Sequence, residues 1–168
     1  MNNSQDDTMD YIIRQMTQKD YYVLEDFLYE AIFMPEGVAA PPKSIINAPE
    51  LQVYIKDFGS KPSDMGLVAE VHGKIIGAVW VRIMNDYGHV DDDTPSFATS
   101  LYKEYRGFGI GTALMKEMLS LLKERGYKKG SLAVQKANYA VQMYKNVGFE
   151  IIDENDEEYI MVCYLEKR

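Results

Sequence analysis

The chain has 168 residues, of which 46% are hydrophobic and 26% are charged, and this suits one globular domain with a sizeable core. Its formal net charge of -8 argues against a nucleic-acid partner, because surfaces that bind phosphates need clustered lysine and arginine. An acidic surface suits a small cationic substrate better. No apolar run approaches the roughly 18 residues of a membrane-spanning helix, so we expect no membrane partner.

The start of the sequence and its content of cysteine and histidine further narrow the class of protein. Residues 1–9 are polar and lack the pattern of a secretory signal, so we expect a disordered tail, a single domain over residues 10–168 and a cytoplasmic location. Cys163 is the only cysteine, which excludes an internal disulfide and a cysteine zinc site. With two histidines and no spaced cluster, we expect no metal site.

The first part of the chain reads as a strand followed by a helix and a loop. Tyr11–Thr17 predicts a strand, and apolar residues spaced at i, i+3, i+4 and i+7 predict a helix after it, capped by Asp20. The proline-rich stretch at 34–48 predicts a long loop, and long loops in compact domains are often functional. A short helix is predicted from about Pro49 to Phe58.

The middle of the chain predicts a β-hairpin. Residues 66–72 and 75–84 read as strands around a "GK" turn, with Trp80 in the core of the sheet. An acidic, turn-rich segment at 85–95 follows.

The remainder alternates between strands and helices. We expect strands at 96–102 and 130–135, helices at 110–125 and 138–147, and a closing hairpin of 149–153 with 158–165. Strands and helices in this order predict an α+β, or mixed α/β, fold with one central sheet covered by helices.

The segment "RGFGIG", Arg106 to Gly111, lies between a predicted strand and a predicted helix. A helix start presents backbone N–H groups that have no partner within the helix, and the helix dipole adds a positive potential. Glycine lets a phosphate approach closely because no Cβ intervenes. Arg106 adds a charged, planar fork suited to phosphate oxygens. The segment therefore predicts a phosphate site, with a simple chain reversal as the alternative.

Two common phosphate templates fail here. A P-loop needs a lysine after its last glycine, and none follows Gly111. The dinucleotide fingerprint needs its third glycine one position later, and an acidic residue about 20 positions further on, where this chain reads "AVQK". Nicotinamide binding is therefore not expected.

A third template fits. Arg106 to Gly111 resembles the Q/R-x-x-G-x-G/A pyrophosphate motif of the GNAT superfamily, the acetyl-CoA-dependent N-acetyltransferases. The stretches "SLYKEYRGFGIGTALM" and "NYAVQMYKNVGFEII" are similar to the two core motifs of that family in order and spacing, so the resemblance covers nearly the whole chain. It implies a mostly antiparallel, twisted sheet of about seven strands with helices on both faces.

The resemblance also implies how the cofactor is held. In this family the strand before the glycines splays from its neighbour and pairs with the pantetheine arm, which assigns Thr99, Ser100 and Leu101 through their main chains. The Leu101 N–H would stabilise the oxyanion formed from the thioester carbonyl. The pyrophosphate would lie on the segment formed by Arg106, Gly107, Phe108, Gly109, Ile110, Gly111 and Thr112.

Two residues of the second motif have implied roles. Tyr144 matches the usual general acid, which protonates the departing CoA thiolate, since a phenol stays protonated at neutral pH. Packing as a buried aromatic residue is the alternative. Asn138 resembles an asparagine that touches pantetheine, but it lies six rather than seven residues before Tyr144. Asn138 is therefore either a cofactor contact or only a helix N-cap.

No general base can be named from the sequence. Where many relatives place a glutamate, this chain has Pro95 and Ser96, and residues 131–135 contain no acid. The acceptor side of the cleft is predicted from loops 34–48 and 85–95, and the acidity of the second loop hints at a cationic amine. Candidate bases acting through water are Asp91, Asp92, Asp93, Glu70 and His89.

We therefore expect an N-acetyltransferase that moves the acetyl group of acetyl-CoA directly to a primary amine in a ternary complex. A polyamine-like molecule, an antibiotic amine and a peptide N-terminus are all compatible acceptors. The alternatives are a non-catalytic acyl-CoA-binding sensor or partner-binding domain and a nucleotide-binding regulatory domain. By analogy with the family, the closing hairpin is a candidate homodimer interface.

Overall fold

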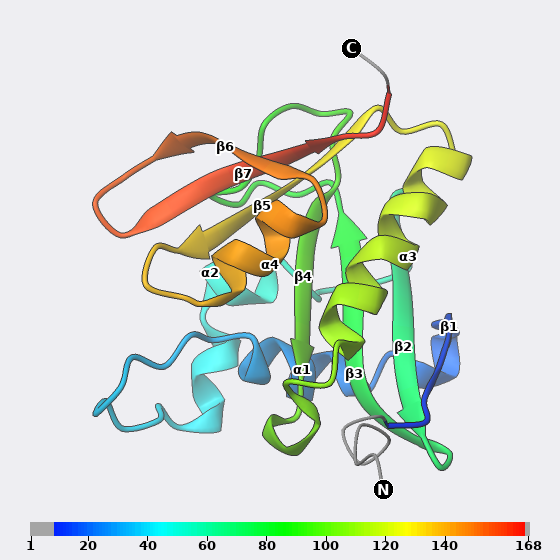
Figure 1. Cartoon of the computed structure of the whole chain (residues 1–168), viewed down its shortest axis with the longest axis vertical. Helices are drawn as coiled ribbons and strands as arrows, with labels where there is room; N and C mark the ends of the chain where they lie inside the picture. Colours follow the sequence, from blue (N-terminus) through cyan, green and yellow to red (C-terminus); the bar gives the residue numbers. More distant parts are fainter. Residues whose placement is uncertain (1–8, 167–168) are drawn as a thin grey trace, which may run out of the picture.

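The computed structural model describes residues 9–166, which form one seven-stranded sheet with helices on both faces (Figure 1). The predicted α+β fold, with its mostly antiparallel sheet, is confirmed. The predicted tail at 1–9 lies outside the described residues except for Met9. The strands are β1 (Ile12–Gln15), β2 (Met65–Val71), β3 (Lys74–Arg82), β4 (Ser96–Leu101), β5 (Lys129–Gln135), β6 (Phe149–Glu154) and β7 (Glu158–Tyr164), and the helices are α1 (Val23–Glu30), α2 (Pro49–Gln52), α3 (Ile110–Glu124) and α4 (Ala140–Asn146).

The strands lie in the order β1-β2-β3-β4-β5-β7-β6. Neighbouring strands pair antiparallel except β4 and β5, which are parallel. The predicted β2–β3 hairpin is confirmed, with its turn at His72 and Gly73, whose positive φ angles of 50° and 80° suit a two-residue hairpin turn. Across the described part of the chain, no helix has the length and apolar character needed to cross a membrane.

Each face of the sheet has its own hydrophobic core. Successive strand residues point to opposite faces, so Val79 belongs to the core under α3 and Trp80 to the core under α1. In α3, the predicted apolar stripe of Met115, Met118, Leu119 and Leu122 is buried against the first face. In α1, Leu24 and Phe27 pack against the second face. The two layers together hold the strands in place on both sides.

The start of α1 differs from the prediction. Asp20 does not cap α1; it ends a short 3-10 turn, and its carboxylate accepts hydrogen bonds from Arg14 at 2.7 Å and from the Thr17 backbone N–H at 2.8 Å. The Arg14 guanidinium holds the pKa of that carboxyl well below its usual range. The ion pair between Asp20 and Arg14 thus occupies the carboxylate oxygen that would have capped the helix. Arg14 lies on β1, which is shorter than predicted and spans only Ile12–Gln15.

The helix predicted from Pro49 to Phe58 is also shorter, because α2 ends at Gln52 and turns follow. The Arg82 guanidinium, on β3, donates to the carbonyls of Val53 at 3.2 Å and Lys56 at 2.8 Å. It also forms a salt bridge with Asp64 at 3.0 Å, in which the two side chains are 3% and 0% exposed. This buried cation binds the segment after α2 to the sheet.

We expect Asp64→Asn to lower the free energy of unfolding by about 3–5 kcal/mol, because it leaves the buried Arg82 charge without its counterion. Urea unfolding followed by circular dichroism measures the change. Asp92→Asn is the matched control, since the Asp92 side chain is 97% exposed, and its urea midpoint should equal that of the parent. Equal midpoints for both variants would contradict the role of the buried pair.

Candidate active site

The sheet opens between β4 and β5. These strands pair at one position, Ser96 opposite Ser131, where the Ser131 N–H donates to the Pro95 carbonyl at 3.0 Å. Beyond that point β4 pairs only with β3, as far as Leu101 opposite Gly77. The predicted splay of the strand before the glycines is therefore present.

A polar network closes the sheet at the base of this opening. The Ser96 hydroxyl donates to the Asp86 carboxylate at 3.1 Å, and the Tyr54 hydroxyl donates to the other Asp86 oxygen at 3.0 Å. The Ser131 hydroxyl donates to the Gly88 carbonyl at 2.8 Å. These bonds hold the segment around residues 86–88 against the two strands where they last meet.

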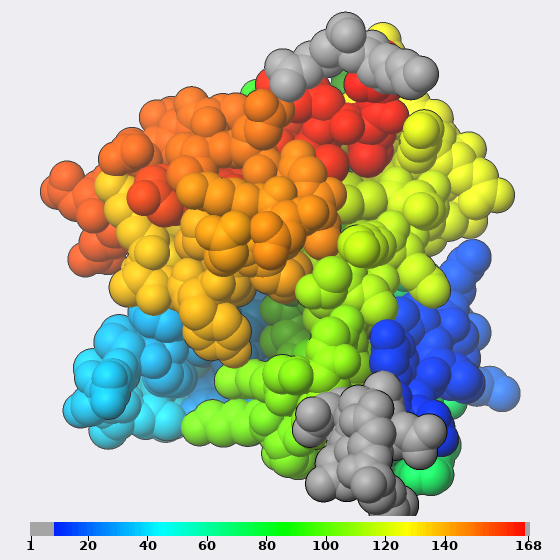
Figure 2. All heavy atoms as spheres, in the orientation of Figure 1, coloured from blue at the N-terminus to red at the C-terminus, as the bar shows by residue number. Residues whose placement is uncertain are grey.

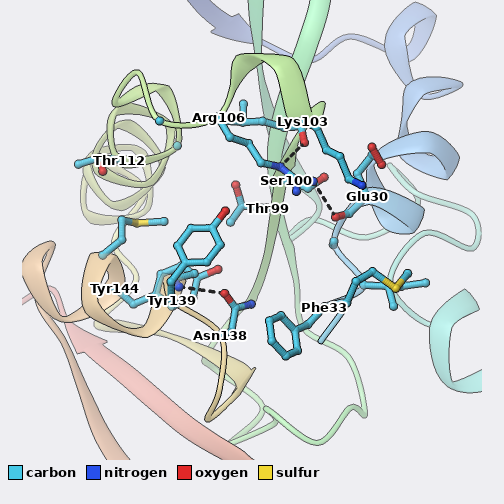
Figure 3. Close-up of a pocket in the computed structure, with 18 of the residues that line it drawn as sticks. Glu30, Phe33, Thr99, Ser100, Lys103, Arg106, Thr112, Asn138, Tyr139 and Tyr144 are labelled. Atoms are coloured by element: carbon cyan, nitrogen blue, oxygen red, sulfur yellow. Dashed lines mark hydrogen bonds between the residues drawn. The ribbon is translucent and has the colours of Figure 1, made fainter. Parts of the chain in front are cut away.

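A cavity of about 670 Å³ lies at the opening. The surface is hollowed there, between the residues of α4 and those around 100–110 (Figure 2). Its walls come from the end of β4 with the glycine turn, from the end of α1 with the loop after it, and from the start of α4 (Figure 3). The predicted site residues that line it are Thr99, Ser100, Leu101, Arg106, Gly107, Gly109, Gly111, Thr112, Asn138 and Tyr144.

Two other predicted residues and one predicted loop do not line the cavity. The Phe108 side chain is 37% exposed on the outer surface, and Ile110 is fully buried in the core under α3. The loop at 34–48 contributes Met34 and Ala40, but no lining residue comes from 85–95. This second loop packs at the base of the opening, so its predicted place on the acceptor side has no support from the lining of the cavity.

The glycine turn leaves a set of backbone donors at the start of α3. Gly107 and Gly109 have φ angles of 87° and 83°, which side chains with a Cβ rarely adopt. The first intrahelical bond runs from the Ala113 N–H to the Gly109 carbonyl at 3.1 Å. The N–H groups of residues 110–112 precede it and have no partner within the helix. This is the geometry that binds a phosphate.

The backbone of β4 supplies another donor. The Tyr102 N–H donates to the Ile76 carbonyl of β3 at 3.0 Å. Because successive N–H groups of a strand point to opposite edges, the Leu101 N–H points to the edge that faces the opening. An extended ligand in the cavity can therefore pair with β4 as a missing strand would.

Arg106 joins the glycine turn to α1. Its Nε donates to the Leu101 carbonyl at 3.0 Å and its Nη2 to the Glu30 carbonyl at 3.3 Å (Figure 3). The last turn of α1 has no basic residue of its own, so this cation complements the negative end of the helix dipole. The Ser100 hydroxyl adds a bond to the Phe27 carbonyl at 2.6 Å. The end of α1 is thus fastened to the end of β4.

Tyr144 contributes a buried phenol to the cavity wall. The residue is 9% exposed, and its ring lies edge-on to Phe149 with a centroid distance of 6.0 Å. Burial raises the pKa of Tyr144 to about 12. The hydroxyl is therefore protonated throughout the neutral range and can act as a hydrogen-bond donor or an acid.

Comparison with known proteins decides the family. The family model described as "Acetyltransferase (GNAT) family" matches residues 19–149. The chain belongs to the GNAT acetyltransferase family. An acetyltransferase of Pectobacterium atrosepticum is 35% identical over 109 residues, which are 64% of this chain and 71% of that protein.

Solved structures of GNAT proteins share the fold. The PaiA N-acetyltransferase from Thermoplasma acidophilum, solved in complex with coenzyme A, has a TM-score of 0.68 at 20% identity and covers 93% of this chain and 99% of that chain. The ribosomal-protein-S18-alanine N-acetyltransferase from Escherichia coli has a TM-score of 0.65 at 15% identity and covers 95% and 96%. At these identities the likeness shows the fold alone.

The GNAT motif residue Asn138 has a local bond in this chain. Its side-chain oxygen accepts a hydrogen bond from the Ala140 N–H at 2.9 Å, at the start of α4. The N-cap position itself is Tyr139, so Asn138 lies one residue before the helix cap and bonds the first residue of α4. Asn138 also lines the cavity, so the cofactor contact stays a prediction.

None of the candidate bases lines the cavity. Asp91 accepts from Thr94 and pairs with Lys129, and Glu70 pairs with Arg14. His89 lies beside Asp92, with 3.3 Å between Nε2 and Oδ1. These side chains form hydrogen bonds and ion pairs within the loops and sheet edges in which they lie.

Sequence reasoning missed several wall residues. Glu30 is the acidic residue among the described residues that line the cavity, and Lys103 adds a cation near Arg106 (Figure 3). Glu30 ends α1 and directly precedes the loop at 31–34, so the only local signal was its place before a long loop. The other missed residues are Tyr29, Ala31, Ile32, Phe33, Tyr139, Ala140 and Met143.

We expect the Tyr144 phenol to stay protonated at pH 10 and to ionise at a pH of about 12, because burial disfavours the phenolate. A pH titration of ¹³C-labelled tyrosine by NMR measures this, with Tyr144→Phe identifying the signal. The unfolded chain ionises first, so the contribution of this group to stability is present below pH 10 and is lost as pH rises toward 12. A midpoint at or below pH 10 would show that the phenol is not buried as described.

Proposed function

We propose that this GNAT protein transfers the acetyl group of acetyl-CoA to a primary amine in a ternary complex. The observation that carries the proposal is the juxtaposition of two features in one cavity: an open strand edge at β4 and a glycine-framed helix start at α3. The first suits the pantetheine arm and the second suits the pyrophosphate. Neither feature alone would indicate this cofactor.

The cofactor would be held mainly by the main chain. The N–H groups of residues 110–112 would bind the pyrophosphate oxygens, with Arg106 and Lys103 supplying positive charge on the same wall. The amides of the pantetheine arm would pair with the β4 edge along Thr99 to Leu101. The acetyl group would then lie where the strands part, close to Tyr144.

The reaction balances with the groups on these walls. The neutral amine would attack the thioester carbonyl, forming a C–N bond, and the Leu101 N–H would stabilise the resulting oxyanion. Collapse of this intermediate breaks the C–S bond, and the thiolate takes a proton from Tyr144. The nitrogen loses its extra proton to water, which also restores the proton on Tyr144. The products are an amide and free CoA.

The pKa of Tyr144 bears on the timing of this step. A phenol with a pKa of about 12 is a weak acid, so it would give up its proton late, as the sulfur gains charge. Before that point it acts as a hydrogen-bond donor to the sulfur. Positioning of the two substrates and oxyanion stabilisation would supply most of the rate enhancement.

We expect Gly111→Ala to weaken acetyl-CoA binding by about 10-fold or more, because a Cβ at this position would displace a phosphate oxygen from the N–H groups. The protein itself has room for the methyl group, since the nearest atoms would lie 3.8 Å away on Leu101 and 3.9 Å away on Met143. Calorimetric titration gives the affinity.

The unfolding midpoint of Gly111→Ala is the internal control and should not fall below that of the parent, because alanine favours helix. Unchanged acetyl-CoA affinity in a folded variant would place the cofactor elsewhere.

We expect Tyr144→Phe to lower kcat by about 100-fold or more with little change in the dissociation constant for acetyl-CoA, because it removes the proton donor for the thiolate. Thiol release against a panel of amines gives the best acceptor, and calorimetry gives the affinity. Tyr22→Phe is the matched control, since Tyr22 is 73% exposed and does not line the cavity.

Two results would count against the proposal in different ways. Equal turnover of parent and Tyr144→Phe would remove the acid role but leave acetyl transfer in place. Tight acetyl-CoA binding without thiol release from any amine would favour the non-catalytic acyl-CoA-binding alternative.

A further inference from the structure

We propose that the acceptor is an amine with a single positive charge and an apolar body, which packs against the loop that follows α1. This inference rests on the proposed function and narrows its substrate class. The evidence is the chemistry of the cavity wall opposite the cofactor-binding elements, together with the bonds that hold that wall in place.

The loop wall is apolar. Ile32, Phe33, Met34 and Ala40 line the cavity from this segment, and the first three are half-buried, so their apolar surface is only partly covered by the protein. Figure 3 shows the Phe33 ring on the side of the cavity remote from Lys103 and Arg106, projecting toward the wall that carries Asn138. Half-buried apolar side chains around a cavity indicate a ligand that covers them.

The loop wall is also held at both ends. Before it, the Glu30 carbonyl accepts from Arg106 and the Phe27 carbonyl accepts from Ser100. Beyond it, the Tyr29 hydroxyl donates to the Pro41 carbonyl at 2.5 Å, which ties α1 to the far side of the loop. A wall that is ordered before the ligand arrives costs less conformational entropy on binding and discriminates better by shape.

The loop wall itself offers no counterion to a second ammonium group. Lys103 and Arg106 would face the pyrophosphate, and Glu30 is the single acidic residue among the described residues that line the cavity. The acidic loop at 85–95, whose charge suggests a cationic acceptor, lies outside this lining. A diamine would place its second ammonium group on the apolar loop wall, at the cost of desolvating that charge.

Thiol release from three acceptors tests this class directly. Phenylbutylamine, aminobutanol and diaminobutane share a primary amine on a four-carbon chain and differ in the terminal group, which is apolar, neutral polar or charged. We expect kcat/KM to be highest for phenylbutylamine and lowest for diaminobutane, with at least a roughly 10-fold difference between them from burial of the ring.

Two loop variants locate the effect. Phe33→Ala should lower the preference for phenylbutylamine over aminobutanol by about 10-fold, because it removes most of the apolar contact. Met34→Glu should raise kcat/KM for diaminobutane by about 3-fold or more, because it places a carboxylate on the wall. Val38→Ala is the matched control, since Val38 is 58% exposed in the same loop and does not line the cavity. Acetyl-CoA affinity, measured for each protein, reports whether the cofactor side is intact.

The outcomes separate this inference from the proposed function. Turnover in which diaminobutane equals or exceeds phenylbutylamine would overturn the apolar, singly charged acceptor while acetyl transfer stands. An unchanged preference in a Phe33→Ala protein that binds acetyl-CoA normally would remove the acceptor from the loop wall. Acetyl-CoA binding without thiol release from these three amines, but with release from another amine of the panel, would overturn this inference alone, and no release from any amine of the panel would overturn both proposals.

Discussion

The parting of β4 from β5 is the constraint on which the rest of this structure depends. Parallel neighbours in a sheet normally satisfy each other's backbone groups along their length, yet here the pairing is confined to Ser96 and Ser131. The Asp86 carboxylate and the Gly88 carbonyl accept the hydroxyl hydrogens at that junction, so the sheet stays closed below it. The unpaired β4 edge is stable because it lines a cavity in which water or a ligand can meet its N–H groups.

Local patterns in the sequence predicted what depends on local geometry. Glycine is the residue that most readily adopts the positive φ angles found at Gly107 and Gly109, and Gly111 leaves the space of a Cβ empty. The glycine spacing therefore made this turn recognisable from the residues alone. The order of strands and helices likewise predicted the sheet and its covering layers. Asp20 shows the limit of such signals: a capping residue is recognisable from sequence, but the Arg14 side chain that takes its oxygens is not.

The wall formed by the end of α1 and the loop after it was predicted only in part, because its position depends on residues far apart in the chain. Arg106 bonds to Glu30 across 76 positions, and Ser100 bonds to Phe27 across 73. The acidity of the loop at 85–95 suggested a cationic ligand, yet Asp86 accepts hydrogen bonds from Ser96 of β4 and from Tyr54 in the segment after α2. Whether a charge serves a fold or a ligand is decided by tertiary neighbours, and a single sequence does not carry that information.

The fastening of α1 has a consequence for how such a domain can diversify. Phe27 and Glu30 receive their bonds on main-chain carbonyls, which every amino acid possesses. Residues 31–34 can therefore be exchanged without releasing the helix that presents them, and the glycine turn is untouched by such changes. Under the proposed function, recognition of the second substrate would be modular, because natural variation or laboratory evolution could change it through a few adjacent codons without altering the glycine turn.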